Sequence, residues 1–115
     1  MTGESDSGAH EDAVEQLTEL GLGLYAARAF VALTALSGGT AVEVSRTADV
    51  PRTRVYDAVE ELSELGLVGV EESTPKRFTP VGTDEAADRF LDEYETRVET
   101  LRAALSTLEA ERDRS

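Results

Sequence analysis

Hydrophobic residues in the first 65 positions recur with the spacing of helices. Residues 12–20 and 24–37 each place apolar side chains three or four positions apart, which predicts two helices. Thr40 is followed three positions later by a glutamate, so a capping box is expected to begin a short third helix there. The fixed φ of Pro51 interrupts that helix and suits the first turn of a fourth, which is predicted over 51–65 with Gly66 as its stop.

Caps and apolar faces can be assigned to these helices from residue spacing. Asp12 and Glu15 have capping-box spacing, so the first helix is expected to begin near Asp12. The expected core-facing residues of the second helix are Leu24, Ala27, Val31, Leu33 and Leu36. Those of the fourth helix are Val55, Ala58, Val59, Leu62 and Leu65.

After Gly66 the spacing of apolar residues changes from the period of a helix to the period of a strand. Residues 67–71 and 77–81 alternate around a turn-like segment, which predicts a β-hairpin. A long helix is then expected from near Thr83 to about Arg112. Two helices joined by a short turn and followed by a hairpin predict a mainly α fold with a small β-hairpin wing, namely a winged helix-turn-helix plus a long C-terminal dimerisation helix.

Length and composition limit the domain organisation. A chain of 115 residues has room for one modest core. Residues 1–10 lack an apolar period and are expected to form a disordered tail, with the DNA-binding domain over 11–82 and the dimerisation helix over 83–115. No leader pattern and no apolar run of about 20 residues is present, so a cytoplasmic protein without a membrane partner is expected. Without cysteine and with His10 as the one histidine, neither a metal site nor another cofactor is predicted.

The net charge of −13 argues at first against a DNA-binding protein. However, the combination of abundant acids, arginine in place of lysine and few aromatic residues resembles haloarchaeal proteins. In molar salt the Debye length is about 3 Å, so charges matter only at contact distance. Local charge therefore matters more than net charge: residues 44–56 contain three arginines and one aspartate.

The fourth helix is the expected recognition helix. The residues expected to meet DNA in its first turns are Pro51, Arg52, Thr53, Arg54 and Tyr56. Acids occupy the rest of that helix, so only its N-terminal end can approach phosphate. The alternative is that these arginines are ordinary solvated residues at a helix end.

Further contacts with DNA are expected from the wing and from the third helix. Thr74, Lys76 and Arg77 surround the hairpin turn and could bind a flanking phosphate or a minor groove. Arg46 could contact the DNA backbone, and a solvated surface position is an equal alternative for it. The expected partner of this surface is double-stranded DNA.

Four segments together resemble the DNA-binding domain of the archaeal TrmB-type regulators. They are the run from Leu20 to Arg28, the T-A-V-E-V run from Thr40, the V-P-R-T-R-V-Y-D run from Val50, and the L-x-x-L-G-L-V run from Leu62. The resemblance covers about residues 14–81, and PadR-type regulators share single pieces of it. It implies a winged fold that binds operator DNA through 51–56 and the Lys76–Arg77 wing.

The chain departs from that family pattern at two points. Asp49 stands where the family usually has a turn glycine, a position that aspartate can occupy in a left-handed conformation. The sugar-binding domain of longer relatives has no counterpart in these residues, so a sugar effector cannot be carried over.

The last helix carries an apolar row with heptad spacing: Leu91, Tyr94, Val98, Leu101, Leu105 and Leu108. A helix of about 30 residues is about 45 Å long, too long to pack wholly on so small a domain, so a homodimer is expected. In a parallel pair Arg97 would face Arg102 of the partner, which favours an antiparallel or more elaborate packing. The alternative is that the row covers the core of its own domain.

Three classes of function can be weighed against these features. The favoured one is a dimeric, sequence-specific transcriptional regulator on a pseudo-palindromic operator, with inorganic ions at its acidic surface. The alternative is a winged-helix protein-interaction module of the transcription machinery that does not touch DNA. An enzyme is not expected, because no triad or phosphate-loop pattern is present.

Overall fold

The computed structural model describes residues 2–114, with side chains described from Gly8 onward, and divides the chain into two compact units. The first unit extends through Thr83 and contains four helices and a small sheet, and the second, from Asp84, is a single helix. The helices of the first unit are α1 (Thr2–Glu19), α2 (Leu24–Leu36), α3 (Ala41–Ala48) and α4 (Arg52–Glu64). Its strands are β1 (Gly39–Thr40), β2 (Val68–Glu71) and β3 (Arg77–Pro80).

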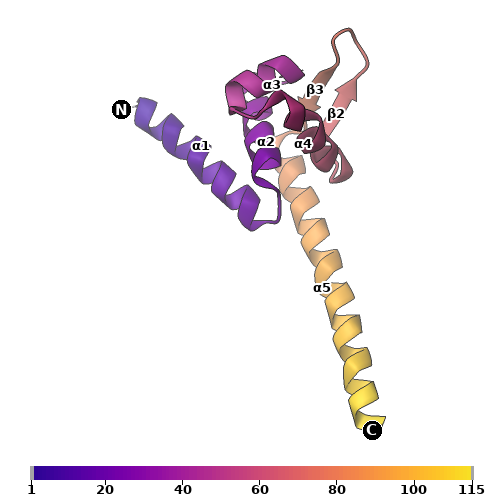
Figure 1. Cartoon of the computed structure of the whole chain (residues 1–115). Coiled ribbons are helices and arrows are strands. Elements are labelled where there is room, and N and C mark those ends of the chain that lie inside the picture. Colours follow the sequence, from indigo (N-terminus) through magenta and orange to yellow (C-terminus); the bar gives the residue numbers. More distant parts are fainter. Residues whose placement is uncertain (1, 115) are drawn as a thin grey trace. The chain divides into compact units, whose positions relative to one another are not determined.

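Helix α2 is the centre of the first unit. It packs against α1, α3 and α4, and Figure 1 shows it between α1 on one side and α3 and α4 on the other. The largest fully buried side chains come from three helices and two connecting segments: Leu33, Val44, Val50, Val55, Leu62 and Leu67. Val68 of β2 and Phe78 of β3 are also buried, so one core joins the helices to the sheet. The mainly α, winged fold expected from the sequence is confirmed.

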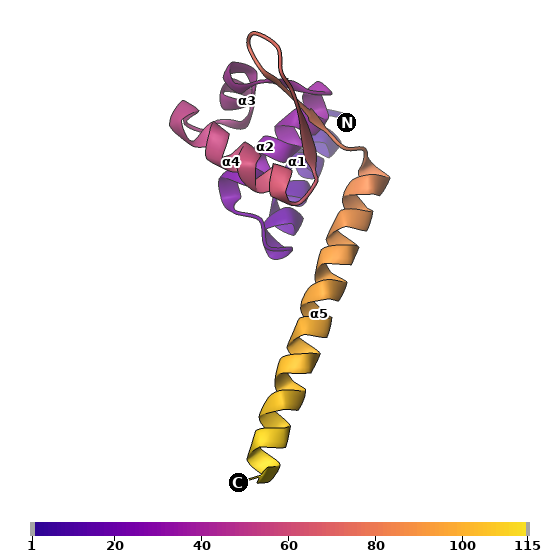
Figure 2. The same cartoon turned by 90° about the vertical axis from the view of Figure 1, so that its right-hand side faces the viewer.

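The three strands form one antiparallel sheet in the order β1-β3-β2. β2 and β3 are the predicted hairpin, with Val70 opposite Phe78, and Figure 2 shows its tip extending beyond the helices. β1 was not predicted, because two residues are too few for a visible alternation. It places Thr40 opposite Arg77, so the start of α3 is joined to the wing.

Three expectations about the helices were wrong. The helix expected to begin near Asp12 begins at Thr2, so the predicted tail over 1–10 is helical where the structure describes it; Met1 lies outside the described residues. No proline interrupts residues 2–11, and a helix anchored by buried Leu17 can extend back through them. α4 begins at Arg52, with Pro51 as its N-cap rather than its first residue.

The predicted apolar face of α2 was the third error. Leu24 and Leu36, at the ends of the helix, are 49% and 40% exposed, whereas Ala26, Ala29 and Phe30 are buried. α2 contacts three other helices, and a helix surrounded in this way buries more than one stripe. A periodicity search for one face therefore selects only part of its core residues.

Helix α5 (Thr83–Arg114) forms the second unit, and it matches the predicted long C-terminal helix. Asp84 and Glu85 lie in its first turn and Arg112 and Arg114 in its last, an order of charges that favours the helix dipole. Three ion pairs between residues three or four apart stabilise its surface: Glu85–Arg89, Glu93–Arg97 and Glu99–Arg102.

Candidate nucleic-acid interface

Local chemistry fixes the two ends of α3. The Thr40 hydroxyl accepts the backbone N–H of Glu43 at 3.3 Å, while the Glu43 carboxylate accepts the N–H of Thr40 at 2.9 Å. This is the predicted capping box, and it fixes where α3 begins. At the other end Asp49 adopts the left-handed conformation, with φ 56° and ψ 48°, as expected for the position where the family pattern has glycine.

The turn between α3 and α4 is held by hydrogen bonds and by burial. The Ser45 hydroxyl donates to the Val50 carbonyl at 2.7 Å, and the Val50 N–H donates to the Ser45 carbonyl at 3.2 Å. The Val50 side chain is only 2% exposed. The direction in which α4 leaves the turn is therefore set by buried contacts rather than by a loose loop.

The N-terminal end of α4 presents its polar side chains to solvent. Pro51, Arg52, Thr53 and Arg54 are all exposed, while Val55 is fully buried and fixes the rotation of the helix. Because the positive end of the helix dipole lies at the start of α4, together with two arginines and no acid in its first turn, this end attracts an anion. The acids Asp57 and Glu60 are exposed further along the helix, as expected.

Tyr56 of α4 lies against strand β3 of the hairpin. Its ring meets that of Phe78 on β3 edge to face, with centroids 6.3 Å apart. Phe78 is buried, whereas Tyr56 keeps 56% of its surface exposed. Tyr56 is thus positioned by the wing while its outer part remains available to a ligand, a link that the sequence did not indicate.

The basic residues of the wing are not free. Arg77 pairs with Glu43 at 3.8 Å, and Lys76 pairs with Glu72 at 3.8 Å across the hairpin turn. All four side chains are at least 45% exposed, and such surface pairs contribute little, about 0–1 kcal/mol. Because these pairs are weak, a phosphate oxygen could replace either carboxylate. Thr74, joined to Pro75 by a cis peptide bond, is exposed at the same turn.

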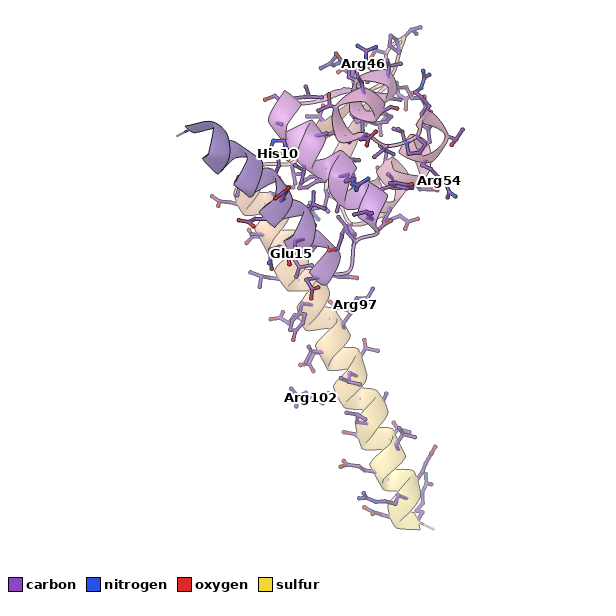
Figure 3. The ribbon with its side chains drawn as sticks, turned by 60° about the vertical axis from the view of Figure 1, so that its left-hand side comes forward. His10, Glu15, Arg46, Arg54, Arg97 and Arg102 are labelled. Atoms are coloured by element: carbon purple, nitrogen blue, oxygen red, sulfur yellow. The ribbon has the colours of Figure 1, made fainter. Side chains whose placement is uncertain are left out.

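Arg46 and Arg54 both lie on the part of the first unit that is away from α1. Figure 3 shows their separation from α1, which carries His10 and Glu15. Arg46 is in the last turn of α3 and exposed. Arg54 borders a groove of about 310 Å³ between α4 and the start of α2, together with Asp57 and Glu61. Two acids beside it limit how much of the Arg54 charge a phosphate would meet.

Glu61 has a structural role that the sequence did not reveal. Its carboxylate accepts the backbone N–H of Gly23 at 2.8 Å, at the N-cap position of α2. α2 has no side-chain cap of its own, so this contact from α4 satisfies one of its free N–H groups. The partners are 38 positions apart, and no local signal could have paired them.

A second groove lies between α1, α2 and the end of α3. It measures about 540 Å³ and is lined by residues of α1, α2 and the end of α3, among them Arg28, Glu15 and His10. Among the side chains described from Gly8 to Arg114, no group of three or more His, Cys, Asp or Glu residues is placed to hold a metal ion. The described helices also include none that could cross a membrane.

Comparison with known proteins assigns the first unit to a family. The family described as "Sugar-specific transcriptional regulator TrmB" matches residues 17–84. The HTH-type sugar sensing transcriptional regulator TrmBL1 of Pyrococcus furiosus is 27% identical over 98 residues, covering 85% of this chain and 29% of its own length. The DNA-binding HTH-type transcriptional repressor TrmBL2 of Thermococcus kodakarensis is 32% identical over 77 residues, or 67% of this chain and 29% of its own.

A solved structure agrees with this assignment. The structure of TrmBL2, described as an archaeal chromatin protein with a novel mode of DNA binding, superposes with a TM-score of 0.81 at 29% identity. It covers 89% of this chain and 41% of the solved one. The chain thus spans less than a third of the length of the curated relatives that it matches.

Proposed function

The chain belongs to the TrmB family, and on that premise we propose that it is a DNA-binding transcriptional regulator that acts in the cytoplasm as a homodimer on a pseudo-palindromic operator. The observation that carries the proposal is the N-terminal end of α4. There Arg52, Thr53, Arg54 and Tyr56 are exposed on a helix whose direction is fixed by the buried turn at Val50. In helix-turn-helix proteins this end of the second helix enters the major groove.

One group of these residues is proposed to contact base edges, and the other to contact the DNA backbone. Arg52 and Arg54 can bind guanine with both guanidinium N–H groups, and Thr53 can meet a base edge or a phosphate. Arg46 and the Lys76–Arg77 wing with Thr74 contact the flanking backbone, which fixes the register without reading sequence. Pro51 and Tyr56 position these groups rather than supply charge.

The homodimer forms through α5. Its apolar row is exposed along the helix: Leu91, Tyr94, Leu101, Leu105 and Leu108 are each at least 50% exposed, and Val98 is half-buried. A row of this kind at heptad spacing is the usual seam of a helix pair. The residue ranges 11–82 and 83–115 then serve DNA binding and dimerisation respectively.

The test is binding to a promoter fragment found by genome-wide mapping of bound sites, measured in molar KCl. The double variant Arg52→Ala, Arg54→Ala should lose about thirtyfold or more in affinity, because each paired guanine contact contributes about 1–3 kcal/mol. The matched control is Arg89→Ala, Arg112→Ala on α5, which removes the same charge. Equal affinity of both double variants would contradict the proposal. Absence of DNA binding together with a stable complex with another protein would favour a protein-interaction module instead.

A further inference from the structure

The apolar row of α5 has charged side chains on both flanks. With Leu91, Val98 and Leu105 at heptad position a and Tyr94, Leu101 and Leu108 at d, Arg97 falls at g and Glu95 and Arg102 at e. Figure 3 shows Arg97 and Arg102 leaving α5 on opposite sides. The two arginines thus flank the seam on different edges, and the direction of a partner helix decides which charges each one meets.

A parallel partner places like charges together. Position g of one helix faces position e of the next heptad of the other, so Arg97 would meet Arg102 twice per dimer. Both arginines are at least 70% exposed in their side chains and reach only single carboxylates of their own helix, Glu93 and Glu99. Neither of these weak contacts would neutralise two facing guanidinium groups.

An antiparallel partner removes that conflict while keeping every apolar layer. When Val98 packs against Leu101 of the partner, Tyr94 meets Leu105 and Leu91 meets Leu108. Position e then faces position e, so Glu95 of each chain meets Arg102 of the other. The helix dipoles also oppose each other favourably in this direction. This arrangement has one unfavourable contact, because Asp88 of each chain faces Glu109 of the other at the ends of the overlap. Salt screens the repulsion between these two acids well.

We therefore infer that α5 binds α5 of a second copy in an antiparallel pair, centred between Glu99 and Thr100, with Glu95 opposite Arg102. The inference rests on the proposed homodimer and adds its direction and register. It places the two Thr83 residues, where α5 begins, about 50 Å apart along the helix axis, whereas a parallel pair would place them side by side.

Cysteine crosslinking can test the direction cleanly, because the chain has no cysteine of its own. We mix full-length chains that carry Arg102→Cys with tagged full-length chains that carry either Glu95→Cys or Arg97→Cys. Each mixture is refolded and treated with a short bismaleimide crosslinker. The expected result is a crosslinked product from Glu95→Cys with Arg102→Cys, at least fivefold above that from Arg97→Cys with Arg102→Cys. The reverse ratio, or no crosslink at either pair in a chain that light scattering finds dimeric, would overturn the antiparallel pair alone.

A charge-reversal variant gives a second test, because its effect on the dimer dissociation constant has opposite signs for the antiparallel and the parallel pair. Arg102→Glu should raise the dimer dissociation constant several-fold in 0.1 M salt if Glu95 faces it, and lower it if Arg97 does. Adding Glu95→Arg to that variant should restore the original dissociation constant only in the antiparallel pair. A wild-type chain that is monomeric by light scattering would contradict the proposed homodimer as well, so the two failures are distinguishable.

Discussion

Glu43 is the residue through which the capping of α3 and the position of the wing are connected. One carboxylate accepts the Thr40 N–H at 2.9 Å and pairs with Arg77 of β3 at 3.8 Å. The hydrogen bond from the Thr40 backbone lowers the pKa of the Glu43 carboxyl most, and Arg77, the Thr40 side chain and Arg46 lower it further against an opposing desolvation. The charged form of Glu43 therefore stabilises the folded state.

The consequence is a pH-dependent contribution to stability. Since the pKa of Glu43 is lower in the folded protein than its ordinary value of 4.5, its contribution is fully present above pH 4.5 and is lost as the pH falls through the folded value. Glu43→Gln keeps an oxygen that can accept the Thr40 N–H but removes the charge. We expect wild type to be more stable than Glu43→Gln at pH 7, with the difference in unfolding free energy shrinking below pH 4.5, as measured by urea denaturation. A difference that stays constant from pH 7 to pH 3 would contradict this assignment.

For individual residues, the sequence predicted the conformations and hydrogen bonds that depend on side chains a few positions away in the chain. The capping box at Thr40 and the left-handed Asp49 follow from side chains acting within a few positions. The contacts of Tyr56 with Phe78 and of Arg77 with Glu43 join residues more than 20 positions apart. They exist only because the sheet brings β3 beside the helices, and no spacing in the sequence encodes them.

At the scale of elements, the contact between α2 and α4 combines apolar packing with one hydrogen bond. Val55, Ala58, Val59 and Leu62 of α4 are buried, and Glu61 caps the start of α2 through the Gly23 N–H. The cap lies on the same helix as the residues expected to read DNA. The orientation of that helix thus depends on an acid that composition alone would count as solvated surface.

Removing this cap should destabilise the first unit without changing its surface chemistry. Glu61→Ala leaves the Gly23 N–H without its partner, so we expect a loss of about 1 kcal/mol in unfolding free energy. Glu60→Ala is the matched control, because Glu60 is an exposed acid on the same helix for which no such contact is seen. Thermal or urea denaturation of the two variants at equal salt measures the difference. Equal stabilities would show that water replaces the Glu61 carboxylate at no cost.

The predicted elements were most accurate where an element is not packed on several sides. α4, the hairpin and α5 match their expected ranges closely, whereas α2 is contacted on several sides and its predicted core residues were partly wrong. β1 has two residues and exists only through pairing with β3. α1 is longer than predicted, because helix propagation needs no apolar period once one turn is anchored.

For the whole molecule, the charge distribution decides how DNA binding responds to salt. A net charge of −13 opposes long-range attraction to DNA, while residues 44–56 carry three arginines against one acid. We expect adaptation to high salt to reconcile the two, since a Debye length of about 3 Å in molar salt leaves only the local excess of arginine. On this proposal, inorganic cations would bind the acids beside the proposed DNA-binding surface.

The final prediction concerns those cations. Ordinary DNA-binding proteins release counterions and lose affinity steeply as salt rises. Here Asp57 and Glu60, exposed on α4, should take up cations when phosphates approach, which offsets the release and makes the dependence of log K on log[KCl] shallower. Asp57→Asn with Glu60→Gln should therefore steepen that slope by about one unit per lost cation, whereas the control Asp12→Asn with Glu19→Gln on α1 should leave it unchanged. Titrations of operator DNA between 0.5 and about 3 M KCl measure the slopes. Identical slopes for all three proteins would mean that the acids of α4 bind no cation in the complex.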